Sequence, residues 1–331
     1  METLLLDYDD VEANAEMAEV IVAVEEAFAA YEAGRVQMPA KSYIELPEYN
    51  GDFRSMPAYM DAGEWDAAGI KWVNVHTDNP EEYELPTVLG TMIYSDAKNA
   101  FPFSIMDGTS LTRIRTGAAA AVATDHLAVE DATSLGIVGA GVQSYTQLEA
   151  ISTVRDIETV VVADKREAAI ERFVDRYGDE FDVRKGSIAE AGGCDVLSTV
   201  TPVRSPIVSS DDLGEHTHVN AMGADAPGKN ELGRGVVTSA KLVIDDYEQC
   251  THSGEINVPW SDGALSDGDL YAEVGEIVAG KRPGRTPEDG VTVFDSTGLA
   301  IQDVATAHVV YERAREEDNG TAFGLVDTRL R

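Results

Sequence analysis

Residues 134–144 read SLGIVGAGVQS, and this stretch decides the fold. The apolar run 134–138 predicts a buried strand, and the Gly-Ala-Gly that follows it predicts a tight turn into a helix. Gly139 permits the turn, Gly141 lets the backbone approach a pyrophosphate, and the first N–H groups of the helix face its negative charge. Ser144 replaces the third glycine of the dinucleotide fingerprint and is small enough for close helix packing. The stretch therefore predicts a Rossmann domain.

The acid expected downstream of this turn is Asp164, which directly follows the predicted strand 159–163 and lies 23 residues after Gly141. Its carboxylate can accept hydrogen bonds from the adenosine ribose, which favours NAD as the cofactor. NADP is the alternative, because the two cations that follow Asp164 could bind a 2′-phosphate. The residues predicted to line the dinucleotide here are Gly139, Ala140, Gly141, Val142, Gln143, Asp164, Lys165 and Arg166.

Strands and helices alternate after this turn, which predicts a parallel sheet covered on both faces. The strands are expected at 134–138, 159–163, 196–200, 217–222, 242–245 and 291–294. Earlier β-rich segments, broken by Pro and Gly, are expected at 41–46, 69–75 and 88–94. The fold class is therefore α/β, with a Rossmann domain at 117–299 and an α+β domain at 1–116 plus 300–331.

Three segments carry helical patterns. Residues 11–33 have apolar positions at helical spacing and precede a helix-ending glycine, Gly34. Residues 117–127 are rich in alanine, which predicts a helical connection between the domains. The segment 300–315 predicts a helix that completes the first domain.

The chain is strongly acidic, with 60 acidic and 25 basic residues and a net charge of −35. Acids are spread along the whole chain, so nucleic acid is not expected as a partner. We interpret the charge as adaptation to a halophilic cytoplasm, because salt would screen the self-repulsion. An acidic mesophilic enzyme is the alternative, and a fall in melting temperature on desalting would favour the first reading.

The N-terminal segment has neither a basic region nor a long apolar core, and no run of the chain has membrane-spanning length. We therefore expect a cytoplasmic protein with no membrane partner. Cys194 and Cys250 stand far apart, without a second Cys or a His at ligand spacing. They predict reduced, buried thiols and no metal site.

Four cations ahead of the Rossmann segment suggest an anion site, although each taken singly is more often a surface charge. They are Lys41, Arg54, Lys71 and Arg115. Arg offers the planar fork that a carboxylate binds. Lys71 lies in an apolar run, where burial would lower its pKa toward that of a useful base.

Residues 223–229, GADAPGK, follow a predicted strand and should lie at the carboxyl edge of the sheet, where ligands bind. Asp225 in this turn could contact a reacting amine or the water that attacks an imine. A helix N-cap is the alternative role.

Blocks along essentially the whole chain resemble the ornithine cyclodeaminase and mu-crystallin family, and within it the archaeal alanine dehydrogenases. They are QMPAKSYIEL, FRSMPAY, GIKWVN, LPTVLG, LTRIRTGAA, GIVGAGVQS, GADAPGKNEL, HSGEINV and VFDSTGLAIQDVA. The resemblance implies a homodimer, formed through a substrate-binding and dimerisation domain at 1–116 plus 300–331. It also implies NAD-dependent, reversible oxidative deamination of a small amino acid, L-alanine, to pyruvate and ammonium.

The resemblance also implies roles for residues. Lys71 would be the general acid and base, with Asp225 as a second catalytic group. Arg54 and Arg115 would hold the substrate carboxylate, and Lys41 would line the same site. The residues implied to approach the cofactor, besides the glycine turn, are Arg115, Thr201, Met222, Gly223, Ala224 and Ser296.

Two other functions stay open. An ornithine cyclodeaminase, which converts ornithine to proline and ammonia, would share the same blocks. A mu-crystallin-like protein would bind NAD or NADP without turnover, although intact Lys71 and Asp225 argue against it.

Overall fold

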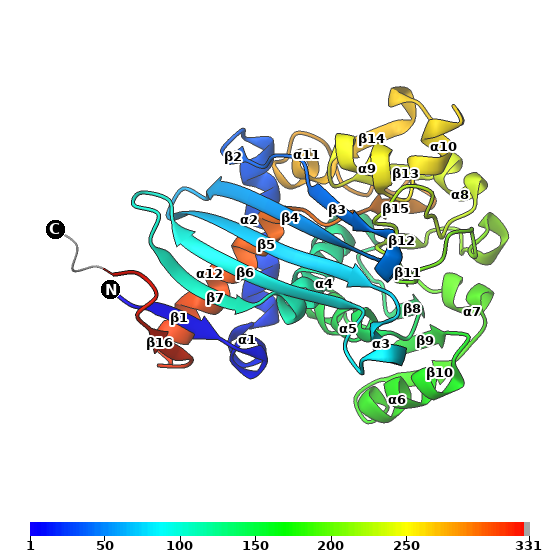
Figure 1. The fold of residues 1–331 in the computed structure, drawn as a ribbon. Coiled ribbons are helices and arrows are strands. Elements are labelled where there is room, and N and C mark those ends of the chain that lie inside the picture. Colours follow the sequence, from blue (N-terminus) through cyan, green and yellow to red (C-terminus); the bar gives the residue numbers. More distant parts are fainter. Residues whose placement is uncertain (328–331) are drawn as a thin grey trace. The chain divides into compact units, whose positions relative to one another are not determined.

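The computed structural model describes residues 1–327. The chain forms two compact units, one of Met1–Arg115 with the described residues from Leu299 onward, the other of Thr116–Gly298. The boundary after Arg115 falls inside helix α4 (Gly108–Leu127). The alanine-rich segment predicted from residue 117 is therefore the second part of a longer helix. Figure 1 shows the helices and strands of both units.

The first unit is built on a mixed sheet of order β16-β1-β7-β6-β5-β4-β2, with β3 pairing with β4. Its strands are β1 (Thr3–Leu6), β2 (Val36–Gln37), β3 (Ser42–Leu46), β4 (Gly51–Asp61), β5 (Asp66–His76), β6 (Val88–Asp96), β7 (Pro102–Asp107) and β16 (Thr321–Phe323). The β1–β7 pair is parallel, and the other pairs are antiparallel.

Strand β4 did not follow from the sequence pattern, because Pro57 stands in its middle. Proline cannot donate to a ladder and is confined to edges and bulges. On one side of β4, β3 pairs with residues 51–55 and β2 pairs with residues 59–60. The segment around Pro57 is thus unpaired on that side, and the strand continues through it.

One face of this sheet is covered by helices. The helices of the unit are α1 (Tyr8–Asn14), α2 (Met17–Glu32), the short α3 (Asn79–Glu82), α12 (Ala300–Glu316) and the 3-10 helix η1 (Pro47–Tyr49). The single helix predicted for 11–33 is in fact two, because the chain leaves helical geometry at Ala15. Helix α12 packs on α2 and crosses β4, β5 and β6, behind which it is seen in Figure 1.

The second unit holds a parallel sheet of order β10-β9-β8-β11-β12-β15-β13-β14. Its strands are β8 (Ser134–Val138), β9 (Thr159–Ala163), β10 (Asp182–Lys185), β11 (Val196–Thr199), β12 (His218–Ala221), β13 (Lys241–Ile244), β14 (Leu270–Glu273) and β15 (Thr292–Asp295). The predicted α/β fold class is confirmed. The two outermost strands, β10 and β14, were not predicted, because they are short, partly exposed edge strands.

Helices follow most strands of this unit, and two apolar clusters of buried residues pack against its sheet. The helices are α5 (Val142–Val154), α6 (Glu167–Tyr177), α7 (Ile188–Gly192), α8 (Arg234–Ser239), α9 (Tyr247–Ser253), α10 (Asn257–Ser261) and α11 (Val274–Val278), with the 3-10 helices η2 (Ser210–Asp212) and η3 (Asp267–Asp269). Cys194 and Cys250 are free and buried, as predicted.

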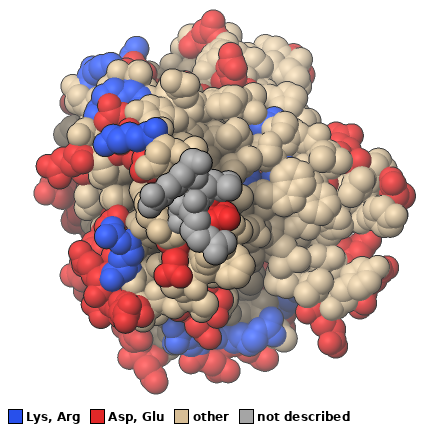
Figure 2. Space-filling view, turned by 60° about the vertical axis from the view of Figure 1, so that its left-hand side comes forward, with Lys and Arg blue, Asp and Glu red and all other residues tan. Residues whose placement is uncertain are grey.

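Acidic side chains are visible around the rim of the face drawn in Figure 2. In Figure 2, Asp and Glu are spread around the face in view, and most Lys and Arg lie beside acids. This distribution matches the acidic runs along the sequence and the net charge of −35. Among the described residues, no helix is long and apolar enough to cross a membrane.

Candidate functional site

Lys71 lies at the centre of the first unit and is almost completely buried, at 1% exposure. It stands on the interior strand β5, directly opposite Met56 of β4 and Met92 of β6. Both methionines are buried. Apolar neighbours on two strands, with α12 across the same face, therefore remove Lys71 from water, in agreement with its apolar sequence context.

The ammonium of Lys71 has two hydrogen-bond acceptors. Its Nζ donates to Asp303 Oδ1 at 2.7 Å and to Thr112 Oγ1 at 3.0 Å. Burial lowers the pKa of Lys71 from 10.5 to about 7, Asp303 opposes this shift, and the charges of Arg115 and Lys41 add to it. A lysine with such a pKa can accept and return a proton near neutral pH.

Asp303 joins Lys71 to a second cation. Its Oδ1 lies 3.3 Å from Nε of Arg115, and Arg115 Nη1 donates to Gln302 Oε1 at 3.3 Å. Asp303 is fully buried in the first turn of α12, where the helix dipole favours a negative charge. Its second oxygen, Oδ2, has no hydrogen-bond partner. One carboxylate thus orients the amine and a guanidinium.

Arg54 and Lys41 complete the set of four predicted cations. Arg54 stands opposite Val73, two residues from Lys71, and so projects from the same face of the sheet. In this structure its fork binds Asp52, with Nε–Oδ1 and Nη2–Oδ2 distances of 3.0 and 2.9 Å. Lys41 is half-buried and close enough for its charge to act on Lys71.

The predicted dinucleotide turn connects β8 to α5 in the second unit. Gly139 has φ +104°, and a Cβ there would approach Thr201 Cγ2 to 2.9 Å, so this position requires glycine. Gly141 is the N-cap of α5, offers no side-chain cap, and has nothing within 4 Å of where a Cβ would lie. Ser144, in the third glycine position, is fully buried. A helix N-terminus without a side-chain cap, at a glycine turn, suits the binding of a pyrophosphate.

Asp164 lies beside this turn, as its position after β9 predicts. Its Oδ2 accepts the Ala140 N–H at 2.8 Å, and its Oδ1 accepts the Arg166 N–H at 2.7 Å. Burial opposes its ionisation, but the hydrogen bonds from Arg166 and Ala140 hold its pKa below the usual range. The carboxylate is thus an ionised acceptor. Arg166 is itself exposed and pairs with it, and Lys165 is exposed as well.

The loops after the next strands carry the other predicted cofactor residues. Thr201 follows β11, and Met222, Gly223 and Ala224 follow β12. Thr201 and Gly223 both donate to Glu231, which sequence reasoning did not single out. Ser296 is buried after β15 and donates to Asp245 at 2.9 Å.

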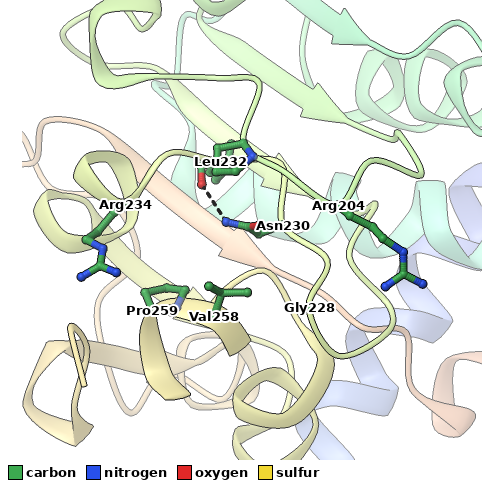
Figure 3. A pocket seen from close by; sticks show the side chains of 8 residues that line it. Arg204, Gly228, Asn230, Leu232, Arg234, Val258 and Pro259 are labelled. Atoms are coloured by element: carbon green, nitrogen blue, oxygen red, sulfur yellow. Dashed lines mark hydrogen bonds between the residues drawn. The ribbon is translucent and has the colours of Figure 1, made fainter. Parts of the chain in front are cut away.

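Asp225 is only partly buried and pairs with Lys229 at 2.6 Å, four residues later. Gly228 and Asn230, just beyond, help to line a pocket of about 340 Å³ within the second unit. In Figure 3, Arg204 and Arg234 stand at opposite ends of this pocket. Among residues 1–327, no group of His, Cys, Asp or Glu is arranged to hold a metal ion.

The family profile of the ornithine cyclodeaminases and mu-crystallins matches residues 1–318. This chain belongs to the ornithine cyclodeaminase/mu-crystallin family. Within the family, it is 45% identical over 322 residues to the alanine dehydrogenase of Archaeoglobus fulgidus, covering 97% of this chain and 98% of that protein. The family resemblance predicted from the sequence blocks is thus confirmed.

Two solved family structures are also similar. A NAD-bound dimer of an archaeal alanine dehydrogenase superposes with a TM-score of 0.93 at 45% identity, covering 98% of this chain and 100% of that one. The Δ1-pyrroline-2-carboxylate reductase of Thermococcus litoralis, bound to NADH and L-proline, superposes with a TM-score of 0.92 at 36% identity. The match covers 96% of this chain and 99% of that one. Both relatives bind NAD or NADH, in agreement with the predicted cofactor.

Proposed function

We propose that this protein catalyses the NAD-dependent oxidative deamination of a small L-2-amino acid, alanine, to the 2-oxo acid and ammonium. The observation that carries the proposal is Lys71, a buried amine with a pKa of about 7 next to Arg115. A near-neutral base beside a guanidinium suits a substrate that has both an ammonium and a carboxylate. The 45% identity to an alanine dehydrogenase supports the choice of substrate.

The glycine turn of the second unit fits NAD. Gly139 and Gly141 leave space where side chains would intrude, α5 offers uncapped N–H groups to the pyrophosphate, and Asp164 offers acceptors to the ribose. When bound, NAD supplies the acceptor for the hydride from the substrate Cα. Asp164 favours NAD over NADP, because a 2′-phosphate would meet its negative charge.

The residues of the first unit handle the substrate and its protons. Arg115 and Arg54 bind the substrate carboxylate, for which Arg54 exchanges its present partner, Asp52. Neutral Lys71 takes a proton from the substrate ammonium, so that the nitrogen lone pair can form the imine. Lys71 then assists the attack of water on the imine and returns a proton to the departing amine, with Asp225 as a second proton carrier.

The test is a substrate panel in concentrated KCl. Purified protein is mixed with NAD and L-alanine, and NADH absorbance, pyruvate and ammonium are measured together. The proposal expects the three products in equal amounts. Proline formed from L-ornithine without net NADH would instead identify a cyclodeaminase, and NAD binding without turnover of any substrate would identify a binding protein.

A second candidate is the reduction of a cyclic imino acid. It is favoured by the similarity to the Thermococcus litoralis reductase, whose solved structure contains NADH and L-proline. The same cation cluster would bind the carboxylate, and Lys71 would protonate the imine nitrogen. Consumption of NADH with Δ1-pyrroline-2-carboxylate, faster than with pyruvate and ammonium, would select this candidate.

We further propose that the active form is a homodimer joined through the uncovered face of the first unit's sheet. The face opposite Lys71 exposes Trp72, Ile93 and Ile44, at 43%, 37% and 52%. A second copy is the expected occupant, because the similar archaeal enzyme is a dimer. Trp72→Glu with Ile93→Glu should give monomers by light scattering, whereas Tyr8→Glu, an exposed aromatic on α1, should not. A wild-type monomer would refute the proposal.

A further inference from the structure

Three buried carboxylates in the second unit are linked through backbone amides. Asp295, the last residue of β15, accepts the N–H groups of Glu255 at 2.8 Å and of Ile256 at 3.1 Å. Glu255 in turn accepts the N–H groups of Glu231 at 2.8 Å and of Leu232 at 2.6 Å. Each acid holds the backbone of the next, although 40 and 24 residues separate them. We call Asp295, Glu255 and Glu231 the carboxylate relay.

Glu231 ends the relay and binds two loops at once. Its Oε1 accepts the Thr201 N–H at 2.8 Å and the Thr201 hydroxyl at 2.6 Å. Its Oε2 accepts the Gly223 N–H at 3.0 Å. A Cβ on Gly223 would lie 2.3 Å from this oxygen, so glycine is required for the contact. One carboxylate therefore fixes the loops that follow the neighbouring strands β11 and β12.

The position of these loops identifies what they serve. In the sheet, β8 with its glycine turn lies between β9, which leads to Asp164, and β11, which leads to Thr201. A dinucleotide crosses such a turn with its adenosine on the acid's side, so its nicotinamide half extends toward β11 and β12. The near contact of Thr201 with the Cβ position of Gly139 places the first loop beside the turn.

The relay is internal to the unit. Asn230 and Leu232 line the surface pocket in Figure 3, whereas Glu231 between them is fully buried. Among the described residues, no Lys or Arg bonds to the carboxylates of Glu231, Glu255 or Asp295. These carboxylates accept from backbone amides and, at Glu231, from the Thr201 hydroxyl. Burial raises the pKa of Glu231 and raises that of Asp295 to about 7. Burying a carboxyl group without a cation beside it costs free energy that an apolar side chain would not cost, so we look for a role that only an acceptor can fill.

We propose that Glu231, held by Glu255 and Asp295, is a positioning residue that fixes the Thr201 and Gly223 loops for the nicotinamide half of NAD. The inference rests on the proposed NAD site. A carboxylate suits this role because both oxygens only accept, and all its neighbours here donate. Glutamine has nearly the same shape, but its NH₂ group would face one of the donors.

The test is Glu231→Gln, studied with NADH and with ADP-ribose, which lacks the nicotinamide. We expect ADP-ribose to bind as in the wild type by calorimetry, and the fluorescence increase of NADH on binding to be lost. In the alanine assay, kcat should fall about 10²-fold with little change in the KM for NAD, because the ring is misplaced. Glu255→Gln should reduce the NADH fluorescence and kcat less, because Glu255 holds the backbone of Glu231 and does not bond the two loops itself.

The matched control is Glu171→Gln, an exposed glutamate on α6, which should change neither ligand. Wild-type NADH fluorescence in Glu231→Gln would overturn the inference. Equal loss of ADP-ribose and NADH binding in both buried variants would also overturn it, because the relay would then serve only the fold. If the wild type binds NADH but does not oxidise alanine, the proposed substrate fails, and the two binding measurements still decide the relay's role.

Discussion

Lys71 in the first unit and Glu231 in the second are both buried charged side chains, but their partners differ. Lys71 donates hydrogen bonds to a carboxylate and a hydroxyl, and Arg115 forms an ion pair with the same carboxylate. Glu231 accepts hydrogen bonds from two backbone amides and one hydroxyl. Burial, opposed by the negative charge of Asp303, lowers the pKa of Lys71 to about 7, so its two protonation states are close in energy near neutral pH. The hydrogen bonds to Glu231 instead hold the backbone of the Thr201 and Gly223 loops in place.

In the proposed mechanism, this difference separates a group that moves protons, Lys71, from one that holds structure, Glu231. A base must be able to exist in both charge states, so it needs a pKa near the working pH. A positioning acid needs only to accept hydrogen bonds. Substitutions in the first cluster should therefore change chemistry and its pH dependence, and those in the second should change cofactor placement.

The largest expected effect is that of Lys71→Met. The variant keeps an apolar chain of similar length but removes the amine, so turnover of alanine should fall about 10²- to 10⁴-fold. NAD binding should persist, because the glycine turn is unchanged. NADH formation and calorimetric titration with NAD measure the two properties.

Lys98→Met is the matched control, because the Lys98 side chain is 80% exposed and its ion pair with Asp66 is long, at 3.9 Å. It should retain full activity. Substantial alanine oxidation by Lys71→Met would show that another group is the base. The cluster around Lys71 would then not be the one that transfers protons.

Asp303→Asn should shift the pH profile. The charge and hydrogen bond of Asp303 raise the pKa of Lys71, whereas burial, Arg115 and Lys41 lower it. Losing the acid should move the acidic limb of kcat/KM, expected at about pH 7, to lower pH. Asp52→Asn, next to Arg54, should leave the limb in place. A limb that moves upward would contradict the assigned electrostatics.

Asp303 also shows where sequence reasoning ended. The burial of Lys71 followed from its apolar neighbours, and the dinucleotide turn followed from the order strand, glycines, helix and acid. The partner of Lys71 lies 232 residues away. Helical periodicity of residues 300–315 places Asp303 beside apolar positions but cannot say which strand it meets. An acid inside the apolar run LAIQDVA was the available clue.

The relay was missed for a related reason. Glu231 and Glu255 belong to the blocks GKNEL and HSGEINV, which supported the family resemblance. Their acceptor contacts are to backbone amides, and a backbone amide leaves no trace in the residue type of its owner. Strand alternation predicted the sheet, but only the structure shows which loops share one carboxylate.

Opposite pH effects on stability should distinguish the clusters further. Asp295 has its pKa raised from 3.8 to about 7, so the folded state holds a proton that the unfolded state has lost, and its contribution to stability falls as pH rises from about 4 to 7. Lys71 has its pKa lowered from 10.5 to about 7, so its contribution rises between about pH 7 and 10.5.

Melting temperatures of Asp295→Asn and Lys71→Met, measured against pH, test these signs. Asp295→Asn should lose the wild-type change of melting temperature with pH between about pH 4 and 7, and Lys71→Met should lose it between about pH 7 and 10.5. Each variant should keep the wild-type change in the other range. The same change of slope in both variants would mean that the two buried clusters do not titrate separately.

The smallest expected effect concerns salt: the fall in melting temperature on desalting should be nearly the same in the wild type and in the two variants. The net charge of −35 resides mainly on the surface, so desalting should lower the melting temperature as the Debye length grows from about 3 Å at 1 M to about 10 Å at 0.1 M. Buried pairs are screened much less. Wild type, Lys71→Met and Glu231→Gln should therefore lose the same number of degrees. A larger loss in either variant would show that its cluster shares in the salt dependence of the surface.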